Sequence, residues 1–270
     1  TIGLADEIRA LTKEMAVAFY DRWYAPDNAI LVVAGAVDPE KVKRLANQYY
    51  GAIPAKNLTS RHRVKEPPQI AARRLKMESG QVGQASWSRR YRAPSYQYGK
   101  TQHVFALQVL SEIIGGGTTS RLYQSMVVEK KLGVAAGSWY RAENIGPSVF
   151  GFYASPQDGV SIDVLEDGVD REIYSVLKDG VTQEEVDAAK IRLQRSAIFA
   201  KDSVTAPARI VGSALATGRS INDIEDWPNK ISNVTRDDVI FAAKWVFNVK
   251  RSLTATLLPK KESPKKPGTL

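Results

Sequence analysis

The chain contains two histidines, His62 and His103, and no cysteine. A stable zinc site needs three or four converging ligands, and His103 has no His or Glu at helical spacing around it. His62 stands in a proline-bearing segment without a second ligand nearby in sequence. We therefore predict no metal site and no catalytic residue in this chain, and interpret His103 as a surface or partly packed residue.

A glycine-rich run, Gly115-Gly116-Gly117-Thr118-Thr119-Ser120-Arg121, is the strongest candidate for a binding loop. It lacks the Gly-Lys-Ser/Thr of a phosphate loop and follows a predicted helix instead of a strand. A serine-hydrolase Gly-x-Ser-x-Gly elbow is also missing from the sequence. Two interpretations stay open: a flexible helix-to-helix turn, or a loop whose exposed amides contact an extended peptide. The second makes Gly115, Gly116, Gly117, Ser120 and Arg121 candidate substrate-binding residues.

The formal charge of +9 is unevenly distributed. Residues 61–92 hold nine basic side chains and two acidic ones, a net charge of +7. Trp87 and Tyr91 lie in this stretch, so a nucleic-acid surface has to be considered. Arg89, Arg90 and Arg92 belong to an alternating strand, however, and could be its solvated side. We interpret the stretch as a solvated surface or one that meets an acidic partner, and expect no nucleic acid as partner.

Residues 1–55 show the pattern of a helix, a strand and a second helix. Thr12 is a predicted N-cap for a helix over 12–23, and Pro26 ends it. The apolar run 29–35 predicts a buried strand. Asp38 and Pro39 then predict a helix that ends at Gly51. Periodicity disappears between residues 52 and 69, where Pro54, Pro67 and Pro68 occur, so we place a linker over residues 56–69.

Residues 70–259 have the elements of a second domain. Strands are predicted over 70–77, 84–93, 134–142, 148–155 and 252–258, and helices over 104–114, from Ser120, over 162–179, from Thr182, over 206–217 and over 235–247. Thr182 and Glu185 form a capping-box pattern. Helices interleaved with short strand pairs indicate an α+β fold, with an antiparallel or mixed sheet packed with helices. The basic tail 260–270 is expected to be disordered.

A weak internal repeat connects the two parts. A Thr-capped helix at Thr12 is followed by a strand that starts 17 residues later, at Ala29, and Thr235 and Ser252 repeat this spacing. If both copies close a domain, the first domain is truncated. Coincidence is the alternative, because Thr-capped helices are common.

The order of several short motifs resembles that of M16 (pitrilysin or mitochondrial-processing-peptidase-like) zinc peptidases. The segment from Thr12 to Asp38 resembles the end of their first domain, and residues 110–124 resemble the glycine-rich loop and helix of their second. The starts Val181-Thr182-x-x-Glu185 and Val234-Thr235-x-x-Asp238 are similar to their later helices. The resemblance covers the chain from about Gly3 to Pro259.

This resemblance implies a chain that contributes chamber wall, a peptide-contacting loop and a subunit interface to a zinc metalloendopeptidase. Its partners would be a peptide substrate and a homologous M16 subunit, identical or different. Zinc would be held by an inverted His-x-x-Glu-His helix and a distal Glu, which would precede Thr1. A noncatalytic M16-like scaffold that never held zinc is the alternative, and the sequence upstream would decide between them.

One family feature is missing. Many members place an Arg and a Tyr seven residues apart to steady the substrate carbonyl and oxyanion, where this chain has Val127 and Val128, then Ala135 and Ala136. Tyr140 and Arg141 are the candidates that could stand in for them. The longest apolar runs are too short to cross a bilayer, so no membrane contact is expected. The compartment stays open, with the bacterial periplasm preferred over the cytoplasm.

Overall fold

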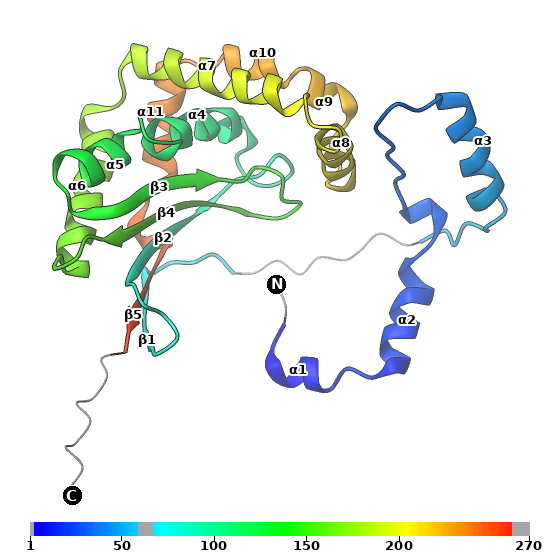
Figure 1. Ribbon diagram of the computed structural model, residues 1–270, viewed down its shortest axis with the longest axis horizontal. Coiled ribbons are helices and arrows are strands. Elements are labelled where there is room, and N and C mark those ends of the chain that lie inside the picture. Colours follow the sequence, from blue (N-terminus) through cyan, green and yellow to red (C-terminus); the bar gives the residue numbers. More distant parts are fainter. Residues whose placement is uncertain (1–2, 59–66, 261–270) are drawn as a thin grey trace, which may run out of the picture. The chain divides into compact units, whose positions relative to one another are not determined.

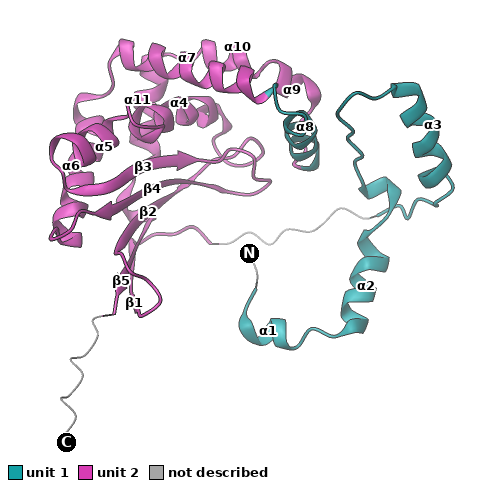
Figure 2. Ribbon diagram, viewed as in Figure 1, with its two compact units in different colours: residues 1–66, 201–216 teal, residues 67–200, 217–270 magenta. Residues whose placement is uncertain are grey.

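The computed structural model describes residues 3–58 and 67–260, which fall into two compact units (Figure 2). The first comprises residues 1–66 and 201–216, and the second residues 67–200 and 217–270. Most of the predicted linker, the predicted disordered tail and His62 lie outside the described residues. No helix among the described residues is both long and apolar enough to span a membrane.

The first unit is built from helices. They are α1 (Ala5–Arg9), α2 (Lys13–Trp23), the 3-10 turn η1 (Pro26–Asn28), α3 (Pro39–Tyr50) and α8 (Ala206–Ala216). The predicted caps are confirmed: the Thr12 hydroxyl accepts from the Met15 amide at 3.3 Å, and the Asp38 carboxylate accepts from the Glu40 amide at 2.9 Å. Each cap satisfies an amide that has no partner inside its helix.

The predicted buried strand over 29–35 is wrong. This segment forms no strand in the structure, and its side chains are not buried: Ile30, Leu31 and Val33 are 50%, 61% and 46% exposed. A strand needs a neighbouring strand to satisfy its backbone groups, and none of the described residues pairs with this segment. In the second copy of the repeat, the segment at Ser252 does form a strand because it has neighbours on both sides.

The second unit contains a five-stranded mixed sheet. Its strands are β1 (Arg73–Ser79), β2 (Ser86–Ala93), β3 (Gly133–Tyr140), β4 (Ser148–Pro156) and β5 (Ser252–Pro259), in the order β1-β5-β2-β4-β3. β1 runs parallel to β5, and the other neighbours are antiparallel. The predicted α+β fold with a mixed sheet is therefore confirmed.

The helices of the second unit lie on one side of its sheet (Figure 1). They are α4 (Val104–Gly115), α5 (Arg121–Tyr123), α6 (Ile162–Asp179), α7 (Gln183–Ala200), α9 (Ile221–Glu225), α10 (Trp227–Ser232) and α11 (Arg236–Val246), with 3-10 turns η2 (Thr101–His103) and η4 (Val249–Arg251) and the π-helical turn η3 (Gln124–Glu129). α4 lies between the sheet and α7 (Figure 1).

The core of the second unit forms between α4 and the inward face of the sheet. Leu107 and Leu110 on α4 and Trp87, Phe150 and Phe152 on the strands are at most 1% exposed. Alternation along β2 buries Trp87, as the period-two pattern predicts. Helices α9 and α10 were not predicted, because each is too short to show an apolar period.

Candidate functional site

The glycine-rich loop begins inside α4. A Cβ atom on Gly115 would lie 1.8 Å from the backbone nitrogen of Ser138, so this position has to be glycine for α4 to approach β3. Gly117 has a φ of +137°, which a side chain would strain. Two of the three glycines are therefore explained by backbone geometry and close packing.

Ser120 closes the loop and is not available to a ligand. Its side chain is buried. The Gly117 carbonyl accepts two hydrogen bonds from Ser120, one from the hydroxyl at 2.7 Å and one from the backbone amide at 3.1 Å. The Gln124 side chain donates to the Thr118 carbonyl at 2.6 Å. The exposed part of the loop is therefore limited to Gly116–Thr119.

Arg121 forms a bidentate salt bridge with Glu185. Its Nε and Nη2 atoms donate to the two carboxylate oxygens at 2.5 and 2.6 Å. The same carboxylate accepts from the Thr182 amide at 2.7 Å, while the Thr182 hydroxyl accepts from the Glu185 amide at 3.2 Å, which confirms the predicted capping box. Burial acts to raise the pKa of Glu185, but the hydrogen bonds from Arg121 and Thr182 outweigh it and lower that pKa.

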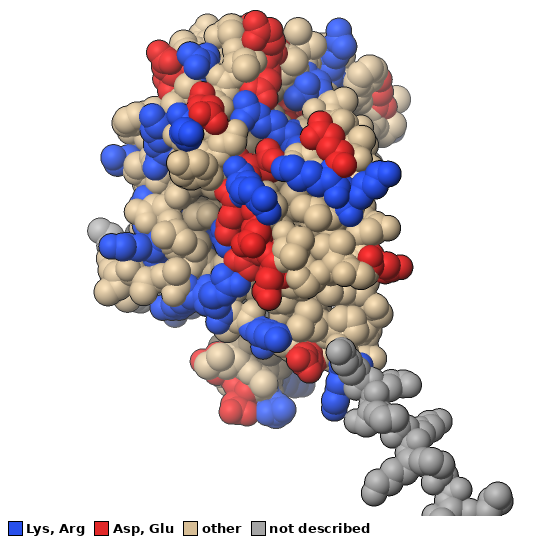
Figure 3. Space-filling view, turned by 90° about the vertical axis from the view of Figure 1, so that its left-hand side faces the viewer, with Lys and Arg blue, Asp and Glu red and all other residues tan. Residues whose placement is uncertain are grey.

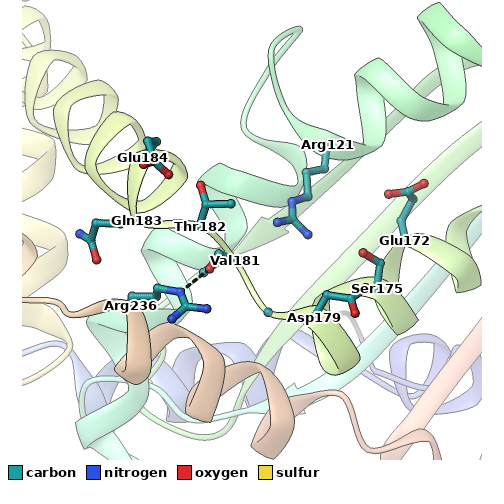
Figure 4. Close-up of a pocket in the computed structure, with 10 residues that line it drawn as sticks. Arg121, Glu172, Ser175, Asp179, Val181, Thr182, Gln183, Glu184 and Arg236 are labelled. Atoms are coloured by element: carbon teal, nitrogen blue, oxygen red, sulfur yellow. Dashed lines mark hydrogen bonds between the residues drawn. The ribbon is translucent and has the colours of Figure 1, made fainter.

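Arg121 also lines an open pocket of about 590 Å³ at the start of α7 (Figure 4). The pocket carries both charge signs, with Glu172 and Asp179 on α6 and Arg236 on α11. Arg236 donates from Nε to the Val181 carbonyl at 2.6 Å. Because acidic and basic side chains both line the pocket, it selects neither anionic nor cationic ligands. The contacts of Glu185 with Arg121 and of Arg236 with Val181 were missed from the sequence, because the partners lie 64 and 55 residues apart along the chain.

Tyr140 does not join this group. Its hydroxyl donates to the Pro94 carbonyl at 2.7 Å, and its ring stacks on Phe150 with 6.1 Å between centroids. Burial raises the pKa of Tyr140 well above its ordinary value, with the nearby Tyr96 and Glu143 acting in the same direction. The structure therefore brings Gly115, Ser120 and Arg121 into one segment and commits Tyr140 to packing.

At the positions where the family places Arg and Tyr, the structure has apolar side chains. Val127 packs against the core, Val128 is 48% exposed and Ala136 is buried. None of these side chains can donate a hydrogen bond to an oxyanion.

A buried charge network joins α6 to the sheet. Arg89 on β2 donates to Glu166 at 2.5 Å, to Thr254 at 3.0 Å and to Asp170, and Arg74 donates to Glu166 at 2.6 and 2.7 Å. The interpretation of Arg89 as solvated is wrong: its side chain is 7% exposed, since it shares the inward face of β2 with Trp87. Burial acts to lower the pKa of Arg89. The hydrogen bond to Asp170 acts in the opposite direction, and the pKa of Arg89 is raised above its ordinary value.

Charges of both signs are also neighbours on the surface. On the side nearest α5 and α6, Asp and Glu side chains gather in a central band with Lys and Arg beside them (Figure 3). Three ion pairs of the second unit involve acidic residues of α6 or α7: Arg74–Glu166, Arg121–Glu185 and Lys130–Glu172. Much of the basic excess is thus compensated locally.

His103 is packed instead of exposed. It is 4% exposed, its ring lies 5.3 Å from Phe241 and 5.5 Å from Trp245, and its Nε2 atom has no hydrogen-bond partner. Burial lowers its pKa, as does Lys100, while Asp238 opposes the shift. Among the described residues, no group of three or more His, Asp or Glu side chains is arranged to hold a metal ion. These residues therefore do not fit a zinc site.

Comparison with known proteins places this arrangement in a family. Residues 10–193 match the family model described as "Peptidase M16 inactive domain". The zinc protease PqqE of Helicobacter pylori is 27% identical over 262 residues, which are 96% of this chain and 57% of that protein. A zinc protease of Streptomyces coelicolor is 28% identical over 94% of this chain and 55% of its own length.

Solved structures agree with the sequence match. A protease from Helicobacter pylori superposes with a TM-score of 0.86 at 25% identity, covering 96% of this chain and 61% of its own. A peptidase M16 inactive domain from Pseudomonas fluorescens has the same fold, with a TM-score of 0.75 at 21% identity over 95% of this chain and 60% of its own. The chain spans little more than half the length of the relatives it matches. It belongs to the M16 peptidase family and carries that family's inactive domain.

Proposed function

We propose that this chain is the noncatalytic part of an M16 zinc metalloendopeptidase that degrades or processes peptides. In this proposal it supplies chamber wall, a peptide contact at Gly116–Thr119 and an interface, while zinc is held by a different polypeptide segment. The names of its relatives as zinc proteases support this assignment. The lack of a fitting ligand set among the described residues agrees with zinc being held elsewhere.

The first unit carries this proposal, because it has almost no core of its own. Within residues 3–58, Ala25 is the one buried hydrophobic side chain. Large apolar side chains on α2, on the 29–35 segment and on α3 are 41–66% exposed: Met15, Phe19, Tyr20, Ile30, Leu31, Val33, Leu45 and Tyr49. Folding has to offset roughly 1–2 kcal/mol of backbone entropy per residue, and burial is the main favourable term. A unit with this surface therefore needs a partner to cover it.

The 29–35 segment indicates how that partner binds. It is apolar and has no strand neighbour among the described residues. Such a segment can join the sheet of another domain, since a new neighbouring strand would satisfy its backbone groups and bury its side chains. We assign the zinc-binding domain as this neighbour.

Catalysis also requires oxyanion donors, which this chain does not have at the positions where the family places them. Loss of one oxyanion donor typically lowers the rate by ~10² to 10³. Val127, Val128, Ala135 and Ala136 cannot provide them, so a homologous subunit would contribute the Arg and Tyr.

The test is reconstitution with a separate M16 zinc-binding domain from the same organism. Leu31→Asp in the first unit should abolish association with that domain, while Val249→Asp, an equally exposed position in the second unit, should not. Association that is unaffected by Leu31→Asp would refute the assigned interface.

A further inference from the structure

The face of the sheet that points away from the helices of the second unit, called here the open face, is not covered by any described helix of that unit (Figure 1). Residues directly opposite one another across the five strands share a face. One row on the open face runs across the whole sheet: Arg73, Leu253, Arg90, Gly151 and Trp139. The next row consists of Leu75, Ala255, Ser88, Tyr153 and Gly137.

The charged residues at outward positions of the five strands all have one sign. Arg73, Arg90 and Arg92 occupy outward positions in β1 and β2, and no Asp or Glu occupies an outward position in any of the five strands. Glu78 is on the inward side, on the same face of β1 as Arg74. Arg141, just beyond β3, lies over the Trp139 ring at 5.8 Å. The face is therefore complementary to carboxylates.

Two aromatic rings lie flat on the backbone of the open face. A Cβ on Gly151 would lie 2.4 Å from the Trp139 ring, and a Cβ on Gly137 would lie 2.5 Å from the Tyr153 hydroxyl. Each glycine is directly opposite the aromatic residue that covers it. A larger residue at either glycine would displace the aromatic ring that covers it. The two glycine–aromatic pairs therefore keep the aromatic rings close to the backbone at this end of the open face.

The other end of the open face is aliphatic. Leu75 and Met77 on the edge strand β1 are 61% and 63% exposed, and Leu257 lies opposite Met77. Apolar rows thus lie directly beside the row that holds Arg73 and Arg90.

The size of the open face selects the kind of partner. With strands ~4.8 Å apart and ~3.4 Å per residue, five strands of this length cover roughly 650 Å². A stable interface between folded proteins needs about 800 Å² from each partner. The face is therefore large enough for a short peptide and too small for a folded protein on its own. Aliphatic side chains cannot donate hydrogen bonds to phosphates, so the aliphatic rows of the open face disfavour a nucleic acid as partner.

We propose that the open face binds a peptide segment in which acidic and apolar residues are mixed, the carboxylates meeting Arg73, Arg90 and Arg141 and the apolar side chains covering Leu75, Met77 and Tyr153. This inference rests on the proposed function in that the peptide is the substrate held by the chamber wall. It names acidic, apolar segments as the class of substrate that is retained.

The experiment measures binding by the chain alone, so it can fail while reconstitution with the zinc-binding domain succeeds. A fluorescein-labelled peptide of two Glu-Glu-Leu-Leu repeats presents both residue types on each side when it is extended. Its anisotropy is compared with that of Lys-Lys-Leu-Leu and Gln-Gln-Leu-Leu versions and of a single-stranded oligonucleotide. The acidic peptide should bind most tightly, and binding should weaken as salt is raised.

Matched charge reversals identify the face. Arg90→Glu should weaken binding of the acidic peptide about tenfold, while Arg195→Glu, an exposed arginine on α7, should leave it within about twofold. Ser88→Glu adds an opposing charge to the middle row and should act like Arg90→Glu, whereas Ser88→Lys should strengthen binding. Circular dichroism checks that each variant is folded.

Three results would overturn the proposal. The first is equal binding of the acidic and basic peptides. The second is an Arg90→Glu variant that binds like Arg195→Glu while both are folded. The third is oligonucleotide binding that is tighter than peptide binding and is lost in Arg90→Glu, which would identify a nucleic-acid surface.

Discussion

Arg89 Nη2 on β2 lies 2.5 Å from Glu166 Oε1 on α6, and the two side chains are 7% and 8% exposed. Neighbouring Arg90 points to the opposite face of the same strand and is exposed. The two adjacent arginines therefore serve different purposes, one fastening a helix to the sheet and the other presenting charge on the open face.

Removing Arg89 should destabilise the second unit strongly. Arg89→Met leaves Glu166 buried with part of its compensation gone, and the loss of one partner from such a pair costs about 3–5 kcal/mol. Arg90→Met is the matched control and should change the unfolding free energy by less than about 0.5 kcal/mol. Urea denaturation, followed by tryptophan fluorescence to which buried Trp87 contributes, measures both. Equal effects of the two changes would contradict the assigned role of Arg89.

His103 should make the second unit less stable at mildly acidic pH. Its pKa is lowered in the folded chain, so above pH 6.5 it is neutral in both states and has no effect. As the pH falls below 6.5, the unfolded chain takes up a proton that the folded chain resists. Stability should therefore decrease, by at most about 1.4 kcal/mol per pH unit, until the pH reaches the lowered pKa.

His103→Phe should remove this pH dependence, because Phe can pack against Phe241 and Trp245 without titrating. Urea midpoints between pH 7.5 and 5.5 provide the comparison, above the range in which most carboxylates titrate. A variant with the same slope as the parent chain would show that another group is responsible.

The loop should separate into a structural part and a binding part. Gly115→Ala would drive a methyl group into the Ser138 backbone and should lower stability by several kcal/mol, as overpacking does. Thr118 and Thr119 are exposed, and replacing both with Ala should leave stability unchanged within about 0.5 kcal/mol. If Gly116–Thr119 contacts substrate, the Thr pair variant should raise the KM of the reconstituted enzyme. An unchanged KM would favour the simple turn.

Capping residues and hydrophobic periodicity predicted most helices and strands, because both depend only on residues that are close in sequence. Thr12, Asp38 and the Thr182–Glu185 box begin helices where the sequence places them. The 29–35 strand failed because pairing depends on a neighbour, which an apolar run does not specify. At the candidate site, the sequence predicted the position of the glycine-rich loop. It did not predict the ion pair of Arg121 with Glu185 or the hydrogen bond of Tyr140 to Pro94, since both partners are distant in sequence.

The proposed function is tested most directly by peptide hydrolysis before and after a zinc-binding domain is added. The chain alone should contain no stoichiometric zinc after dialysis and should not cleave a fluorogenic peptide, because its described residues do not fit a zinc site. Addition of a separate M16 zinc-binding domain, together with a homologous subunit that carries the Arg and Tyr, should produce zinc-dependent cleavage. That cleavage should be lost with Leu31→Asp and kept with Val249→Asp. One tightly held zinc and ordinary cleavage rates in the chain alone would contradict the account, as would a folded, fully assembled mixture that stays inactive.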